Sequence, residues 1–282
     1  MSTTATVNAA SAPTRRAAPG TYRVTWVGVL RSELAKFLSL RSSWITLGLA
    51  MFFVVGFGIV SAVRYNPADP TGGRLGASAP SSAVAIALGG QNFAQLAVGV
   101  LGVLLMTGEY STGMIRSTLT AVPRRLPVLV SKAGILAIVV FIVATAAVVI
   151  AFLGGQSSLS GTKLALTLSS SGVPGALLGA GGYFALVAVI GVALGALIRS
   201  TAGSIAALVT ALMLLPVLTD ILPGNLGNDV SPYLPSNAGT AMFDMTRDSA
   251  TTLSPGVGAA VFAGWALLAL VAAAYRLLRT DA

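Results

Sequence analysis

The 282-residue sequence contains no cysteine and no histidine. Without cysteine the chain can form neither a disulfide bond nor a thiolate metal site. Without histidine it lacks both the commonest general base near neutral pH and the commonest metal ligand. We therefore expect no catalytic residue, no metal site and no cofactor, and we expect that this chain is not an enzyme.

Charged residues are also scarce. They make up 9% of the chain, whereas hydrophobic residues make up 55% and the mean hydropathy is +0.86. Ordinary soluble domains carry roughly 25% charged residues. A soluble particle of this size could not cover its surface with so few polar groups, whereas a bilayer removes that need. The composition therefore indicates an integral membrane protein.

Six stretches of about 20 residues carry no charge, and each is long enough to cross a hydrocarbon core of ~30 Å. One charge at the centre of such a helix costs ~2.5–3.5 kcal/mol, which would cancel about half a dozen good apolar residues. Six buried core helices in a soluble protein would leave almost no surface to wet. The sequence thus predicts an all-α membrane protein with six transmembrane helices, over residues 43–63, 88–107, 133–153, 174–198, 201–219 and 257–275.

The positions of Lys and Arg predict that both chain ends lie in the cytoplasm, because cytoplasmic loops carry an excess of these residues. With this N-in/C-in topology, the outer segments hold only Arg64, Arg74, Lys163 and Arg247. The cytoplasmic segments hold the other 13 of the 17 Lys and Arg residues: Arg15, Arg16, Arg23, Arg31, Lys36, Arg41, Arg116, Arg124, Arg125, Lys132, Arg199, Arg276 and Arg279. This asymmetry accounts for the net charge of +9 without a nucleic-acid partner.

The region before the first span divides into two parts. Residues 1–21 are rich in Ala, Ser, Thr and Pro and are predicted to form a disordered cytoplasmic tail, while residues 22–282 form the membrane domain. Residues 22–41 read as an amphipathic helix suited to the membrane interface. Its apolar arc holds Trp26, Val27, Leu30, Leu34, Phe37 and Leu38; its polar residues are Arg31, Ser32, Glu33, Lys36 and Ser39.

The segment after the second span predicts a second short amphipathic helix, over residues 109–122. Glu109 is expected in its first turn, where an acid favours the helix dipole. Ile115, Leu119 and Val122 share one face, while Arg116, Arg124 and Arg125 are polar. Such a helix can transmit force from a cytoplasmic partner. Composition alone favours an ordinary interfacial helix whose arginines contact lipid phosphates.

No sequence motif for nucleotide hydrolysis or acyl transfer is present. The nearest approach to a phosphate-binding loop lies between Gly155 and Lys163, but its spacing is wrong and no Ser or Thr follows the lysine. The G-x-S-x-G motif of serine hydrolases does not occur.

Three segments resemble ABC-2 type transporter permeases. The first is RSELAK at residues 31–36, followed by RSSW at 41–44. The second is GEYSTGMIRSTL at 108–119, with VPRR at 122–125. The third is YLPSNAG at 233–239, which resembles actinobacterial members, as does the Ala-, Gly- and Val-rich composition. The resemblance covers about residues 22–278.

This resemblance implies a permease subunit of an ATP-binding cassette exporter in the bacterial plasma membrane. It implies a separate ATP-binding subunit as a partner, and a second permease subunit, identical or different. The loop after the second span would be a coupling helix that docks on the ATPase, with contacts from Glu109, Tyr110, Gly113, Ile115 and Arg116. The interfacial helix and its junction would use Arg31, Glu33, Lys36, Arg41 and Trp44. An ATP-independent secondary transporter or a channel-like subunit is the alternative.

Polar residues within the spans have two interpretations. Gln91, Asn92 and Gln95 could line a substrate path, or they could form hydrogen bonds between helices. Secondary transporters commonly bury ionisable residues at the membrane midplane, and the predicted spans contain none there.

Small residues and proline give further expectations. The pairs Gly175/Gly179 and Gly191/Gly195 are expected to serve internal helix packing. Pro216 predicts a kink in the fifth span. Ser236 is expected to cap a short helix reaching Arg247, with Met242 and Phe243 facing lipid.

Overall fold

The computed structural model describes residues 25–68, 82–114, 125–219, 226–245 and 253–279. Within these ranges six helical runs are long and apolar enough to cross a membrane, and each overlaps one of the six predicted spans. They are α2 (Arg41–Val63), α4 (Gln91–Ser111), α6 (Arg125–Leu159), α7 (Val173–Ile198), the continuous run α8 (Thr201–Val209), η1 (Thr210–Leu214) and α9 (Leu215–Thr219), and α12 (Pro255–Arg279). The short helices are α1 (Trp26–Ser39), α3 (Ala83–Ala87), α10 (Leu226–Val230), η2 (Ser231–Tyr233) and α11 (Pro235–Thr240). The predicted tail at residues 1–21 lies outside the described ranges.

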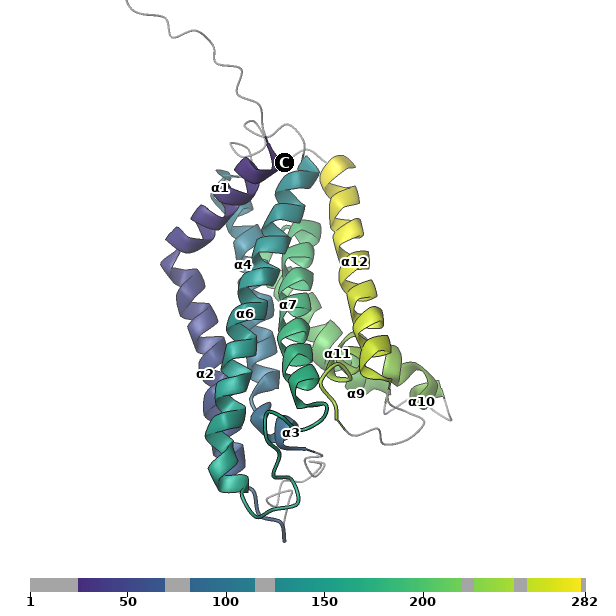
Figure 1. The fold of residues 1–282 in the computed structure, drawn as a ribbon. Helices are drawn as coiled ribbons and strands as arrows, with labels where there is room; N and C mark the ends of the chain where they lie inside the picture. The colour runs from purple at the N-terminus through teal and green to yellow at the C-terminus, as the bar shows by residue number, and fades with distance from the viewer. Residues whose placement is uncertain (1–24, 69–81, 115–124, 220–225, 246–252, 280–282) are drawn as a thin grey trace, which may run out of the picture.

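The helices form an elongated bundle in which successive spans run in opposite directions (Figure 1). α1 and the C-terminal end of α12 lie at one end of the bundle, and α3 and α10 lie toward the other. The helix that contains the third predicted span is longer than that span. α6 has 35 residues and begins at Arg125, so it includes Lys132, which the sequence had placed in a loop.

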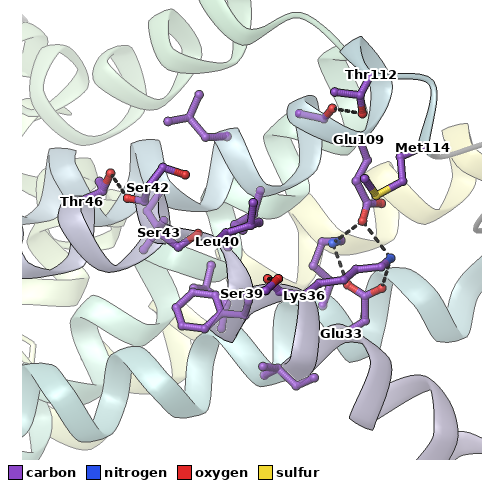
Figure 2. Close-up of a pocket in the computed structure, with 18 residues that line it drawn as sticks. Glu33, Lys36, Ser39, Leu40, Ser42, Ser43, Thr46, Glu109, Thr112 and Met114 are labelled. Atoms are coloured by element: carbon purple, nitrogen blue, oxygen red, sulfur yellow. Dashed lines mark hydrogen bonds and ion pairs between the residues drawn. The ribbon is translucent and has the colours of Figure 1, made fainter.

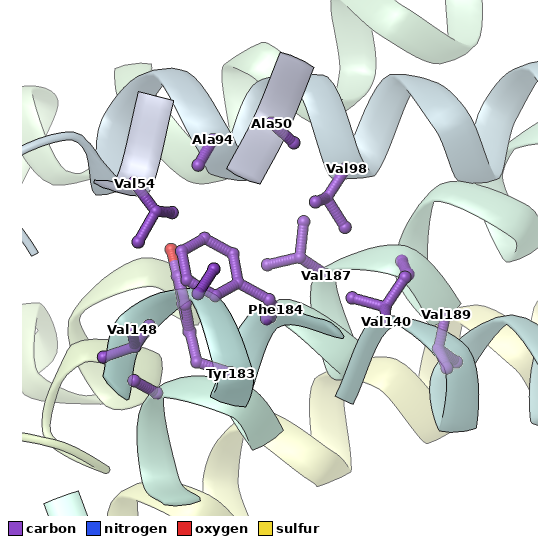
Figure 3. Packing of buried hydrophobic residues seen from close by; sticks show 14 of the residues in the cluster. Ala50, Val54, Ala94, Val98, Val140, Val148, Tyr183, Phe184, Val187 and Val189 are labelled. Atoms are coloured by element: carbon purple, nitrogen blue, oxygen red, sulfur yellow. The ribbon is translucent and has the colours of Figure 1, made fainter. Parts of the chain in front are cut away.

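α7 is the central helix of the bundle. It contacts α4, α6 and α12, and Tyr183 and Phe184 in its middle are fully buried. Figure 3 shows these two rings among small aliphatic side chains such as Ala50, Val54 and Ala94 from neighbouring helices. Small side chains let the helix backbones approach closely around the two large rings.

Glycine makes a close contact possible between α4 and α7. A Cβ atom on Gly102 would collide with the carbonyl oxygen of Ala188, and one on Gly191 would collide with the carbonyl oxygen of Gly99. A Cβ atom on Gly195 would make a tight contact with the side chain of Met106. The expected internal packing role is therefore confirmed for Gly191 and Gly195 and for Gly179, where a Cβ atom would collide with the carbonyl oxygen of Met242. It is wrong for Gly175, where a Cβ atom meets nothing within 4 Å among the described residues.

The segment after α11 differs from its prediction. α11 ends at Thr240, and its N-cap position is Leu234, so Ser236 lies inside the first turn. Phe243 does not face lipid: it is buried with its ring edge-on to Tyr183, 5.6 Å between centroids. Phe243 packs in the aromatic cluster around Tyr183. The sequence pattern alone could not show this contact between distant segments.

The fifth span changes its hydrogen bonding just before Pro216. Proline has no backbone N–H to donate within a helix. A π-helical segment over Thr210–Leu214 precedes it, and the N–H of Leu215 donates to the carbonyl of Thr210. The helix is therefore locally widened before Pro216, whereas the kink expected there stays a prediction.

We expect Gly102→Ala to destabilise the bundle by ~1–3 kcal/mol, because the added methyl group must push α7 away from α4. Gly134→Ala is the matched control. A Cβ there meets nothing within 4 Å among the described residues, so helix propensity should leave the stability unchanged or raised by up to ~1 kcal/mol. Reversible unfolding in mixed micelles measures both variants. Equal stability of the two would contradict the close α4–α7 contact.

Candidate functional site

Four charged side chains converge at the end of the bundle where α1 lies (Figure 2). Glu33 and Lys36 come from α1, Glu109 from α4 and Lys132 from α6. Lys36 Nζ lies 2.7 Å from Glu33 Oε1 and 3.1 Å from Glu109 Oε1. Lys132 Nζ lies 2.7 Å from Glu33 Oε2 and 2.9 Å from Glu109 Oε1. Each lysine therefore bridges both glutamates, and the four form a closed ionic ring.

The local sequence of α1 brings two members of the ring together. Thr25 caps the helix by accepting a hydrogen bond from the N–H of Gly28 at 3.2 Å. Glu33 and Lys36 are three residues apart and therefore lie on the same side of the helix. The sequence did not predict which side of this helix meets the bundle: Glu33 is buried between Val29 and Phe37, one turn away on either side. The apolar residues of the predicted arc other than Phe37 are exposed instead: Trp26, Val27, Leu30, Leu34 and Leu38.

Burial makes the pairing obligatory. Glu33, Glu109 and Lys132 are 4%, 6% and 6% exposed, so none of these charges can be hydrated on its own. A buried charge that loses its partner destabilises a protein by ~3–5 kcal/mol. With two glutamates and two lysines the ring is neutral as a whole. It therefore fixes how α1, α4 and α6 meet, since any displacement of one helix separates charges.

The two α1 members of the ring have shifted pKa values. Burial by itself would raise the pKa of Glu33, but the ammonium groups of Lys132 and Lys36 outweigh it and hold this pKa below the ordinary value. Burial would lower the pKa of Lys36, but its bonds to Glu33 and Glu109 raise it above the ordinary value. Glu33 contributes stability that is lost as pH falls through its lowered pKa; Lys36 contributes stability that is lost as pH rises through its raised pKa. Both stay charged throughout the neutral range.

Glu109 does not open a new helix, as its sequence context had suggested. It lies in the last turn of α4, which ends at Ser111. An acid at this end faces the negative pole of the helix dipole, so its position is unfavourable unless cations offset it. Lys36 and Lys132 supply them. Gly113, with φ of 71°, then turns the chain away in a conformation that suits glycine.

The other predicted contact residues are distributed around this end. Tyr110 lies under the guanidinium group of Arg199, 5.2 Å from the ring centroid. Trp44 donates from Nε1 to the carbonyl of Leu38 at 3.3 Å and packs edge-on against Phe37. Arg31 and Arg41 are exposed. Ile115 and Arg116 lie outside the described residues.

The amide residues predicted for a substrate path lie away from the ionic ring. Gln95 is buried, accepts a hydrogen bond from the hydroxyl of Tyr183 and donates one to Asn92 Oδ1 at 3.2 Å. Gln91 is half-buried and Asn92 is exposed. Gln95 thus serves the contact between α4 and α7, and the substrate path is still a prediction.

Lys132 is the member of the site that sequence reasoning missed. Its position just before an apolar run made it look like a loop residue. The available signal was the scarcity of acids: of the chain's eight, only Glu33, Glu109 and Asp281 stand on the predicted cytoplasmic side. Two isolated acids beside apolar segments need cations nearby, and Lys132 is a close candidate in sequence to Glu109.

A cavity of about 410 Å³ opens beside the ionic ring. All four ring residues line it, together with residues of α2 and apolar residues of α4 and α6 (Figure 2). Among the described residues no group of three or more acids could hold a metal ion. The lining of the cavity presents charged groups, hydrogen-bonding groups and apolar side chains.

Comparison with known proteins gives no assignment. The chain matches no family model, and no curated protein matches it.

We expect Lys132→Met to destabilise the protein by ~3–5 kcal/mol, because it leaves two buried carboxylates with one ammonium group. The double variant Lys132→Met/Glu109→Gln restores neutrality, so its loss should be smaller than the sum of the two single losses by at least ~1 kcal/mol. Reversible unfolding in mixed micelles measures this coupling.

Lys163→Met is the matched control, because Lys163 is exposed on the segment between α6 and α7 and lies outside the ring. It should change stability by less than ~0.5 kcal/mol. Additive losses for the two ring substitutions would show that the four charges do not act as one unit.

Proposed function

We propose that this chain is the transmembrane permease subunit of an ATP-binding cassette exporter, and that a separate subunit hydrolyses the ATP. The observation that carries the proposal is the ionic ring. It fastens α1 to the end of α4 and to the first part of α6, which flank residues 115–124. These are the residues of the proposed coupling helix.

The ionic ring is suited to a region that receives mechanical force from a partner subunit. Its four contacts are short, and three of its four residues are buried, so the end of α4, the first part of α6 and the whole of α1 should move together. A displacement of the segment between α4 and α6 would be transmitted to all three helices and would not be absorbed by a flexible linker. Energetic coupling between distant sites needs contiguous contacts of this kind.

The orientation is part of the proposal: the ring end faces the cytoplasm, with both chain ends on that side. The excess of Lys and Arg supports this orientation. We propose α1 as an interfacial helix, because its exposed side carries Trp26, Val27, Leu30, Leu34 and Leu38, which suit the boundary between headgroups and acyl chains. Exposed Arg31 and Arg41 are placed to contact lipid phosphates.

A six-span chain is half of the proposed transporter, which has a second permease subunit and resides in the bacterial plasma membrane. Several spans have the free surface that a second subunit needs. Only 17% of the fifth span and 22% of α12 are buried within the chain, against 72% of α7. In the proposed transporter Gln91 and Asn92 line the substrate path, whereas Gln95 positions α4 against Tyr183.

Co-purification tests the proposal. We expect an ATP-binding subunit with a phosphate-binding loop to co-purify with the chain from native membranes. Arg116→Glu should reduce its recovery at least about tenfold, because one reversed charge at a contact costs about as much as a tenfold change in affinity, ~1.4 kcal/mol. Mass spectrometry of the purified complex measures the recovery.

Arg64→Glu is the matched control, since Arg64 is exposed at the opposite end of α2 from the ionic ring. It should leave recovery unchanged. A stable assembly that transports without any ATPase subunit would contradict the proposal and favour the secondary-transporter alternative.

A further inference from the structure

The cavity beside the ionic ring combines an apolar part with a polar end. The apolar part is lined by Leu101, Ile135 and Leu136, which are buried in α4 and α6. The polar end holds the four ring residues and hydroxyl groups of α1, α2 and α4 (Figure 2). The volume of about 410 Å³ falls within the ~300–1,000 Å³ range of small-molecule pockets. The cavity therefore has the size and the polarity gradient of a site for an amphiphile.

The lining of the cavity continues onto the apolar surface of the bundle. Leu40, at the junction of α1 and α2, and Leu104, within the second span, both line the cavity and are both exposed. In a bundle that spans a membrane, exposed leucine side chains on a span face acyl chains. A ligand can therefore enter this cavity from the bilayer.

Water is a poor occupant of the apolar part. A water molecule inside a protein needs about two to four polar partners. Leucine side chains such as Leu101 and Leu136 offer none. The hydroxyl groups of Ser39, Thr46 and Thr112 already donate to backbone carbonyls three or four residues earlier, at 2.9, 3.0 and 2.8 Å. An acyl chain requires no hydrogen bond, so it fills this part more favourably than water does.

The ionic ring exposes a lysine and hides its glutamates. The side chain of Lys36 is 30% exposed, whereas the side chains of Glu33 and Glu109 are 3% and 7% exposed. A group that approaches the polar end therefore meets an ammonium group before it meets a carboxylate, although the ring as a whole is neutral. This arrangement favours an anionic group over a cationic one.

Arg41 adds a positive charge beside the cavity. It adjoins Leu40 and Ser42 in the sequence, both of which line the cavity, and it is exposed. It forms no ion pair with any residue that the structure describes. The segments that precede α1 and follow α4, residues 1–24 and 115–124, contain no Asp or Glu in the sequence and so offer Arg41 no side-chain carboxylate. An anionic ligand would complement this charge.

We propose that this cavity binds a membrane phospholipid whose headgroup carries a net negative charge. One acyl chain lies in the cavity along Leu101, Leu104 and Leu136, and the phosphate group lies at the polar end, where Arg41 donates to it. Apolar contact supplies affinity for the chain, and charge sets the preference among headgroups. The proposal requires that the ring end lies at a membrane surface, but it does not depend on the partner ATPase or on transport.

Photolabelling of the purified full-length chain in detergent micelles tests this site. The probe is phosphatidylglycerol with a diazirine in one acyl chain, and peptide mass spectrometry locates the label. The competitors are unlabelled phosphatidylglycerol and phosphatidylcholine with the same acyl chains, so that they differ only in headgroup and net charge. We expect saturable labelling of α4 and α6. Phosphatidylglycerol should halve it at about tenfold lower concentration than phosphatidylcholine, because the charged side chains exposed at the polar end are basic.

Arg41→Gln tests the headgroup contact. It should reduce the preference for phosphatidylglycerol from about tenfold to about twofold, because one arginine close to a headgroup contributes about a fivefold change in affinity. Arg64→Gln is the matched control, since Arg64 is also exposed but lies at the other end of α2. It should keep the tenfold preference.

Gly108→Leu tests the cavity itself. Gly108 lines the cavity, and a Cβ there meets nothing within 4 Å among the described residues, so a leucine takes up cavity space without a collision at its Cβ. Gly134→Leu is the matched control: it makes the same change in α6, also in open space, at a residue outside the cavity lining. Gly108→Leu should abolish saturable labelling of α4 and α6, and Gly134→Leu should keep it.

Three results would overturn the proposal: equal competition by the two lipids in the wild type, a tenfold preference that survives Arg41→Gln, or unchanged saturable labelling of Gly108→Leu. The Arg41 arm decides the matter even if Gly108→Leu fails to fold, because Arg41 is exposed and outside every ion pair of the described residues. Recovery of an ATPase subunit does not enter these readouts, so the lipid site and the exporter function stand or fall separately.

Discussion

The position of α1 depends on the ionic ring of Glu33, Lys36, Glu109 and Lys132. α1 is a short helix whose large apolar side chains mostly face away from the bundle, and only Val29 and Phe37 join Glu33 in its buried face. Two buried apolar residues hold a helix weakly. Four alternating charges that share three helices hold it firmly, because separating them exposes unpaired charge to a low dielectric.

The same ring explains how an acid is tolerated at the end of α4 and a lysine in α6. Glu109 would be unfavourable at the C-terminal pole of a helix, and Lys132 would be unfavourable in the wall of an apolar bundle. Each is stable because the other is present.

Features that follow from local composition could be predicted from the sequence, and features that depend on contact between distant segments could not. The six spans follow from apolar runs, and the packing of Gly191 and Gly195 follows from small residues at a helical spacing. The ring joins residues 73 and 23 positions apart, which no helical period reveals. The prediction that Phe243 faces lipid was wrong for the same reason, since its burial depends on Tyr183 in another helix. The inward side of α1 could not be predicted, because in a membrane protein the apolar side of a helix need not be the inward side.

The proposed exporter function requires that the ionic ring lies on the cytoplasmic side, where a nucleotide-hydrolysing partner can reach it. The chain has no cysteine, so single introduced cysteines report position directly. Ser111, at the end of α4, and Ser160, just after α6, are both exposed and stand at opposite ends of the bundle. With a membrane-impermeant maleimide on intact cells, Ser160→Cys should be labelled at once, and Ser111→Cys only after the membrane is permeabilised. The reverse pattern would place the ring outside the cell and contradict the account.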